Sequence, residues 1–194
     1  MSETKKSQLK MYRLPGPIKS YPLPEGYTVR NYKGEEDIAA WCEICLNGLV
    51  GSTDPQNFVN AISSRDDCDP YSDVFFICDE NGRPCATVTA IKQPDGTGDM
   101  HMVSVLTEYR GKGLGNCLAE ICIRSLQERE VKYIYLTTDE WRVAAVKSYL
   151  TSGFLPVEYN EGMTDRWLAE MELYGIDRLT MLSEDCKYLK TLTR

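Results

Sequence analysis

A glycine-rich turn joins an apolar segment to an amphipathic one at residues 103–115, which read Val-Ser-Val-Leu-Thr-Glu-Tyr-Arg-Gly-Lys-Gly-Leu-Gly. Glycines let the backbone approach an anion closely, and the first amides of a helix lack an intrahelical partner at the positive end of the helix dipole. Arg110 and Lys112 add positive charge. The segment therefore predicts a pyrophosphate-binding turn. It lacks the Gly-Lys-Ser/Thr ending of a P-loop and the GxGxxG spacing of a dinucleotide fold, so neither of these sites is favoured.

Eight cysteines are spread through the chain and could indicate a disulfide framework or a metal site. A structural zinc site needs two ligand pairs, but Cys42 and Cys45 form the one CxxC pair and His101 is the one histidine. Several cysteines fall in apolar helix-like or strand-like stretches, where a free thiol packs as a small hydrophobe. We therefore predict reduced core thiols and no metal.

Hydrophobic spacing predicts the elements that precede the turn. Residues 27–32 alternate like a short strand, 35–49 carry an apolar stripe at helical spacing, and a second, short helix after Asp54-Pro55 ends near Ser64. Residues 65–73 are a polar, acidic connection, which is either a solvated loop or part of a substrate mouth.

A strand meander and a second half follow. Residues 74–78 and 84–91 flank Asn81-Gly82, which favours a tight antiparallel hairpin, and 100–106 returns as a third strand. The helix after Gly115 and a strand at 133–137 complete a βαβ unit. Beyond it the pattern predicts a helix at 142–152, a strand at 154–158 and a helix at 164–175.

Two motifs in this frame resemble one family. Arg110-Gly-Lys-Gly-Leu-Gly115 fits the Gln/Arg-x-x-Gly-x-Gly/Ala acetyl-CoA motif of the GCN5-related N-acetyltransferases (GNATs). Ala145-Val-Lys-Ser-Tyr-Leu-Thr-Ser-Gly-Phe154, about thirty residues further on, resembles the family's AxxxYxxxGF signature. The resemblance covers roughly residues 26–160.

The resemblance implies the GNAT fold, an α/β (α+β) architecture. Its mixed central sheet has an antiparallel meander, flanking helices and two splayed strands, here 100–106 and 133–137. We expect an extended N-terminal arm (1–26), an acetyltransferase domain (27–160) and a C-terminal helical extension packed on the same domain (161–194).

The resemblance also implies acetyl-CoA as the cosubstrate. The backbone at Val103, Val105 and Leu106 would bind the pantetheine arm, and an amide near Val105 would polarise the thioester carbonyl. Arg142 stands where many members have asparagine, seven residues before Tyr149, and is retained as a cofactor contact. The pyrophosphate would be held by the residues of the turn, namely Arg110, Gly111, Lys112, Gly113, Leu114 and Gly115.

Acetyl transfer to an amine needs a base for the ammonium and an acid for the leaving thiolate. The resemblance makes Tyr149 the acid; the alternative is a core tyrosine on a helix face. The resemblance makes Asp99 a candidate base, because some GNATs carry a catalytic carboxylate at the start of this strand, and His101, on the same side of the strand by period two, is the second candidate. The alternatives are a turn aspartate and a half-buried histidine. Cys117, in the first turn of the helix, is a competing nucleophile that we rank behind direct attack.

The sequence thus predicts an acetyl-CoA-dependent N-acetyltransferase that moves an acetyl group to a primary amine by direct attack in a ternary complex. The alternative is a noncatalytic acyl-CoA-binding regulatory or interaction module. The acceptor is a small-molecule or peptide amine whose identity the sequence does not reveal, and homodimerisation is left open.

Composition sets the outer bounds. The chain has 194 residues, 42% hydrophobic and 26% charged residues and a net charge of −7. It has no apolar run of the roughly 18 residues that a membrane span requires, and its first residues lack a secretory signal, so we expect a cytoplasmic protein without a membrane or nucleic-acid partner. Acidic residues gathered at 66–73 beside the cleft would favour a cationic acceptor, whereas acidic residues spread over outer faces would report solubility alone.

Overall fold

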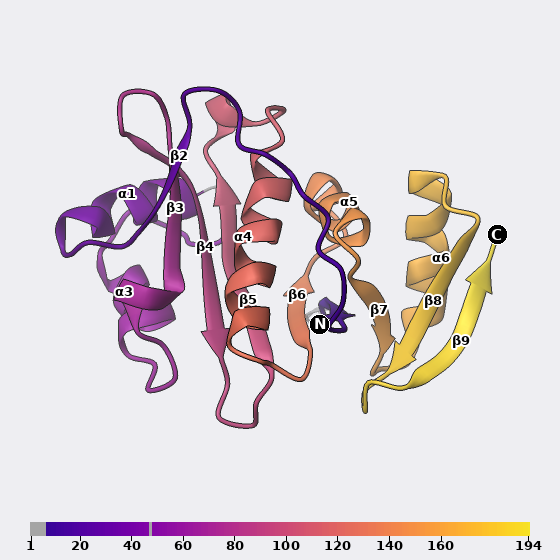
Figure 1. Ribbon diagram of the computed structural model, residues 1–194. Coiled ribbons are helices and arrows are strands. Elements are labelled where there is room, and N and C mark those ends of the chain that lie inside the picture. Colours follow the sequence, from indigo (N-terminus) through magenta and orange to yellow (C-terminus); the bar gives the residue numbers. More distant parts are fainter. Residues whose placement is uncertain (1–6, 47) are drawn as a thin grey trace, which may run out of the picture. The chain divides into compact units, whose positions relative to one another are not determined.

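The computed structural model describes residues 7–46 and 48–194, which divide into two compact units. The central unit comprises residues 15–134. The terminal unit comprises the described residues up to 14 together with residues 135–194. Each unit has its own strands and helices (Figure 1).

Four antiparallel strands form the sheet of the central unit. Their order is β2 (Thr28–Asn31), β3 (Val74–Cys78), β4 (Pro84–Lys92) and β5 (Gly98–Val105). The predicted β3–β4 hairpin is confirmed, with Phe76 opposite Thr87. Gly82 adopts a φ of +80° in the connecting turn, a conformation that glycine enters without steric cost.

Two helices cover opposite faces of this sheet. Gly98 faces α4 (Leu114–Glu128), because a Cβ at Gly98 would lie 2.9 Å from Leu126 Cδ1. Ser104 faces α1 (Glu36–Cys45), since its hydroxyl donates to the Ile44 carbonyl at 2.7 Å. Period-two alternation then assigns Asp99 and His101 to the α1 face. The two residues therefore lie on the same side of the strand, as the sequence predicts.

A β-bulge interrupts β5 between His101 and Ser104. Thr89 lies opposite His101 and Thr87 opposite Ser104, so Met102 and Val103 together face a single residue of β4. Met102 has a φ of +50°, which is uncommon for a residue with a side chain. Bulges of this kind turn backbone groups out of the ladder, and they are frequent beside active sites.

The connections of the central unit depart from prediction in two places. The first helix ends at Cys45 and not at residue 49, because the buried stripe stops there and Leu46 is 45% exposed. The connection 65–73 contains a short helix, α3 (Pro70–Asp73), which a capping aspartate followed by proline starts. The second helix is confirmed as α2 (Gln56–Phe58) continued by a π-helical turn, η1 (Val59–Ser63), with Ser64 as its C-cap.

The terminal unit also has a mixed arrangement of strands and helices. The strand order is β6 (Ile134–Thr138), β1 (Leu9–Arg13), β7 (Leu155–Glu158), β8 (Arg178–Ser183) and β9 (Tyr188–Thr193), where β6 starts on the last residue of the central unit. β1 pairs antiparallel with β7, β7 parallel with β8, and β8 antiparallel with β9. The two helices are α5 (Val143–Thr151) and α6 (Met163–Tyr174), both predicted.

Two domain expectations need correction. The arm predicted at 1–26 contains the paired strand β1, in which Leu9, Met11 and Tyr12 are all buried. A strand buried on both faces shows no clear period-two alternation, so the sequence pattern did not predict β1. The extension predicted as helical at 161–194 has one helix followed by the β8–β9 hairpin. The splay expected between 100–106 and 133–137 falls across the two units and stays a prediction.

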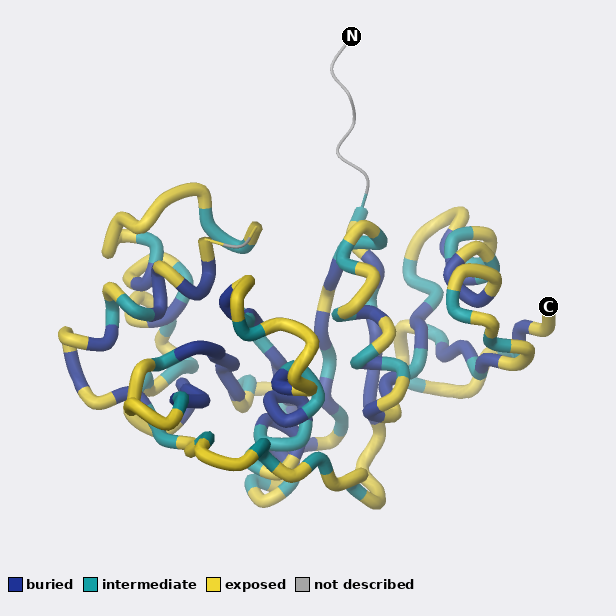
Figure 2. Tube along the Cα trace, turned by 90° about the horizontal axis from the view of Figure 1, so that it is seen from above, coloured by how far each residue is buried: buried dark blue, intermediate teal, exposed yellow. Residues whose placement is uncertain are grey.

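The buried residues are mainly apolar residues of the helices and strands (Figure 2). All eight cysteines are free thiols; six are buried, and Cys68 and Cys186 are half-buried. Across residues 7–46 and 48–194, no group of three or more histidine, cysteine, aspartate or glutamate side chains is arranged to hold a metal ion. No helix in the same residues has both the length and the apolar character that crossing a membrane requires.

Candidate active site

The predicted pyrophosphate turn joins β5 to the N-terminus of α4. Gly111 and Gly113 adopt φ values of +79° and +81°, and Gly113 is the residue that precedes the helix. Among the described residues, the amides of 111–115 donate to no backbone carbonyl. A Cβ at either glycine would meet nothing within 4 Å. The turn therefore offers unpaired amides, an open approach and the positive end of a helix, which are the features that suit a pyrophosphate.

Lys112 is held in place by two tyrosines that the sequence did not single out. Its Nζ donates to the Tyr27 hydroxyl at 2.9 Å and lies 5.0 Å from the Tyr109 ring centroid. The Tyr109 hydroxyl in turn donates to Asp79 at 2.7 Å. The hydrogen bond to Tyr27 raises the pKa of Lys112, so its ammonium group stays charged beside the turn. No local signal links residues that lie 85 positions apart.

The end of β5 presents backbone amides away from β4. Leu106 donates its amide to the Cys85 carbonyl at 2.9 Å, and Val105 lies opposite Ala86. Antiparallel pairs alternate between bonded and non-bonded, so the amide of Val105 points away from β4. Val103 lies in the bulge, where this alternation is interrupted. These are the amides predicted to meet pantetheine, whereas the amide of Leu106 is already used within the sheet.

Asp99 and His101 lie beside the residues that follow η1. Arg65 Nη1 is 3.5 Å from Asp99 Oδ2. Both residues lie close enough to His101 to influence its pKa, and so does the backbone of Ala61. Burial lowers the pKa of His101, an effect that outweighs the opposing influence of Asp99. The imidazole is therefore neutral at pH 7 and able to accept a proton. Sequence analysis missed Arg65, although it is the one cation among the acidic residues of 65–73.

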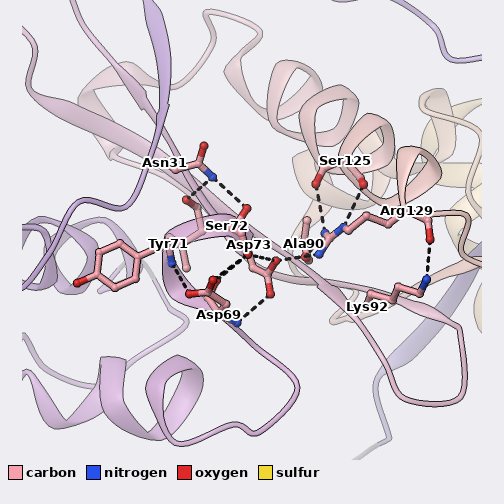
Figure 3. Close-up of polar contacts among 10 residues, drawn as sticks. Asn31, Asp69, Tyr71, Ser72, Asp73, Ala90, Lys92, Ser125 and Arg129 are labelled. Atoms are coloured by element: carbon pink, nitrogen blue, oxygen red, sulfur yellow. Dashed lines mark hydrogen bonds and ion pairs between the residues drawn. The ribbon is translucent and has the colours of Figure 1, made fainter.

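Three of the four carboxylates of residues 65–73, those of Asp67, Asp69 and Asp73, have partners within the protein, and Figure 3 shows the contacts of Asp69 and Asp73. Asp67 pairs with Arg65 at 2.9 Å, which holds the pKa of that carboxyl below its usual range. Asp69 caps α3 through the Tyr71 amide. Asp73 is buried and pairs at 2.8 Å with Arg129, the residue that follows α4. Much of the negative charge is therefore compensated internally, and this segment gives little support to a cationic acceptor.

Tyr149 lies on α5 in the terminal unit. Its side chain is buried and packs edge-on against Phe154, with ring centroids 5.9 Å apart. Gly153 ends the helix at a φ of +87°, and Phe154 and Gly153 donate their amides to Tyr149 and Leu150. This is the bonding pattern of a Schellman cap. The Tyr-x-x-x-Gly-Phe spacing thus has a structural basis of its own, in addition to any chemical role of the hydroxyl.

Arg142 and Cys117, the last two predicted residues, both have contacts within the protein. Arg142 precedes α5, lies 4.4 Å over the Trp141 ring and is 3.8 Å from Asp139. Cys117 is buried and hydrogen-bonds the Pro22 carbonyl at 3.8 Å, and burial raises its pKa, which disfavours an acyl-enzyme route. The structure thus brings Asp99, His101 and residues 103–115 into the central unit, whereas Arg142 and Tyr149 lie in the terminal unit.

Residues 24–154 match the model of the acetyltransferase (GNAT) family, a stretch that includes the turn, both base candidates and Tyr149. This chain is a GNAT family member. The fold agrees, since this GNAT is similar to the GCN5-related N-acetyltransferase of Sphaerobacter thermophilus, with a TM-score of 0.61, 20% identity and coverage of 78% of this chain and 49% of that one. It is likewise similar to the ribosomal-protein-S18-alanine N-acetyltransferase of Escherichia coli, with a TM-score of 0.54, 20% identity and coverage of 66% and 76%.

The sequence relatives of this GNAT include two mycothiol acetyltransferases. The one from Streptomyces griseus is 29% identical over 152 residues, 76% of this chain and 49% of the relative. The one from Frankia casuarinae is 27% identical over 152 residues, 72% of this chain and 44% of the relative. This GNAT therefore spans about half the length of the curated relatives it matches.

Proposed function

We propose that this GNAT transfers an acetyl group from acetyl-CoA to a primary amine by direct attack in a ternary complex. The unpaired amides of 111–115 at the N-terminus of α4 carry the proposal, because they form an anion site inside the stretch that defines the family. The names of its relatives, all acetyltransferases, support the same class of reaction. The free cysteines support a reducing compartment such as the cytoplasm.

Acetyl-CoA supplies the acetyl group as a thioester. The turn holds the pyrophosphate through its amides, with Arg110 and Lys112 adding charge, and Arg142 is a further contact. The backbone of Val103 and Val105 binds the pantetheine arm, and the Val105 amide points away from β4. The Val105 amide also polarises the thioester carbonyl, an interaction that is typically worth a few kcal/mol in the transition state.

Proton transfer sets the roles of the side chains. An acceptor ammonium loses one proton to the base, its freed lone pair forms the C–N bond, and the C–S bond breaks. The thiolate takes a proton from the Tyr149 hydroxyl, and the second proton of the new amide nitrogen returns to the tyrosinate. His101 is the better base of the two candidates, because its imidazole is neutral at pH 7 while Asp99 is engaged by Arg65. The amide product carries the acetyl group.

Thiol release from acetyl-CoA tests the proposal across polyamines, aminoglycosides, amino acids, peptide amines and, because of the relatives' names, desacetylated mycothiol. We expect turnover with at least one amine and a KM for acetyl-CoA that is insensitive to the acceptor. Tight CoA binding without turnover on any amine would contradict the proposal and favour a binding module.

A further inference from the structure

Arg65 connects the loop after η1 to the base candidates on β5. Its guanidinium is bidentate to Asp67, at 2.9 and 3.0 Å, and its Nη1 is 3.5 Å from Asp99 Oδ2. The side chains are 25%, 18% and 10% exposed, in the order Arg65, Asp67, Asp99. One cation therefore bridges two largely buried carboxylates from different segments.

Both ends of this loop are fixed to the rest of the central unit. Arg65 donates its amide to the Ile62 carbonyl at the end of η1. At the far end, Asp73 pairs with Arg129, whose guanidinium also binds the Ala90 carbonyl and the Ser125 hydroxyl (Figure 3). The segment that carries Arg65 is therefore anchored to the central unit at both of its ends.

The groups that face His101 come from three segments. Asp99 contributes a negative charge from β5, and Arg65 and Asp67 contribute one charge of each sign from the loop. The backbone of Ala61 in η1 also acts on the ring and raises its pKa. Burial and Arg65 favour the neutral ring, whereas the two carboxylates and the Ala61 contact favour the protonated ring. Burial thus decides that the pKa of His101 is lowered, and Asp99 and Arg65 act on that pKa in opposite directions.

We propose that Arg65 is a positioning residue for acetyl transfer, which ties the 65–73 loop to β5 through Asp99 and offsets the charge of that carboxylate beside His101. The inference rests on the proposed function, because it concerns the base of that reaction. In the step it serves, the acceptor N–H bond breaks, the imidazole nitrogen takes the proton, and the electron pair stays on the amine for C–N bond formation. Asp99 then balances the imidazolium until its proton passes to water.

The chain offers a direct test because His101 is its one histidine. An NMR titration of the imidazole C–H proton therefore reports a single pKa without assignment. We expect the wild-type value below the ordinary 6.5. Arg65→Gln should raise it by roughly half a unit to one unit, and Asp99→Asn should lower it by a similar amount, because each variant removes one of two opposing charges. The acid limb of the kcat/KM profile should move with it.

Two further variants distinguish positioning from a structural role. Arg65→Lys keeps the charge but loses the planar fork, so we expect a titration near wild type together with a raised acceptor KM. The Arg65→Lys variant also tests the inference if Arg65→Gln does not fold. Arg124→Gln is the matched control, since this exposed arginine of α4 pairs with Glu120 and should leave both readouts unchanged.

The outcomes separate this inference from the proposed function. If the wild type transfers acetyl and a folded Arg65→Gln variant leaves both the titration and the pH profile unchanged, the inference fails and the proposed function stands. A titration shift that the pH profile does not follow also overturns the inference. If the wild type releases no thiol with any amine, the proposed function itself fails, whatever the titration shows.

Discussion

Replacing Arg129 with methionine removes the cation that faces the buried Asp73 carboxylate while preserving the packing of the aliphatic stem. Asp73 keeps its contacts with the Asp69 amide and the Ser72 hydroxyl, both at 3.0 Å, but loses the ion pair at 2.8 Å. The Ala90 carbonyl also loses its donor. The variant thus leaves a carboxylate that is 5% exposed without its counter-ion.

The expected cost follows from this geometry. Breaking a buried pair from one side costs about 3–5 kcal/mol, and we take the low end, about 3 kcal/mol, because the Arg129 side chain is 30% exposed and water partly screens the pair. For a chain of this size, that corresponds to a fall in Tm of roughly 6–12 °C. Arg124→Met is the control, since its pair with Glu120 is half-exposed and worth at most about 0.5 kcal/mol.

Urea denaturation followed by the fluorescence of Trp41, the one tryptophan of the central unit, measures the effect in the unit that contains the pair. Trp141→Phe and Trp167→Phe substitutions in the background remove the two signals from the terminal unit. Asp73→Asn and the double variant complete a cycle, in which we expect a coupling energy above about 1 kcal/mol. The reasoning is refuted if Arg129→Met costs no more than Arg124→Met.

Four further predictions follow from single residues. Gly113→Ala and Gly82→Ala each place a methyl group in open space at nearly equal φ, +81° and +80°, so both should cost about 1 kcal/mol of stability. Calorimetry should show that Gly113→Ala alone weakens CoA binding, by roughly tenfold. Equal affinities of the two variants for CoA would argue against the turn as the binding site. Tyr149→Phe should lower kcat about 100-fold with little change in the KM for acetyl-CoA, and an unchanged kcat would remove the acid role. Because folding lowers the pKa of His101, its contribution to the free energy of unfolding should be constant above pH 6.5 and should decline as pH falls from 6.5 through the pKa of the folded protein. His101→Gln should abolish that decline in pH-dependent denaturation. Persistence of the full decline in the variant would assign it to other groups. Thiol titration should find eight cysteines in denaturant and slow reaction in the native protein, even at half-buried Cys68, whose pKa burial raises to about 12; rapid native labelling would contradict this.

The candidate site shows which inferences local sequence could support. The turn at 110–115 was identified correctly as an amide-rich helix start, because glycines with positive φ and an amphipathic helix are encoded within a few residues. The Gly153 cap is local in the same sense. The irregular bulge of β5 at Met102 was not foreseen, since it depends on how the strand pairs with β4 and not on its own residue pattern.

The sequence by itself determined the family, the glycine-rich turn at the start of α4, most of the helices and the antiparallel meander, all of which rest on periodicity and short motifs. The tertiary structure alone decided that Arg65 meets Asp99, that Tyr27 holds Lys112, and that Arg129 compensates Asp73. It also placed β1 beside β7. The physical reason is that these contacts join residues 34 to about 145 positions apart. The free energy that closes such loops comes from the assembled core, and no pattern within one segment encodes it.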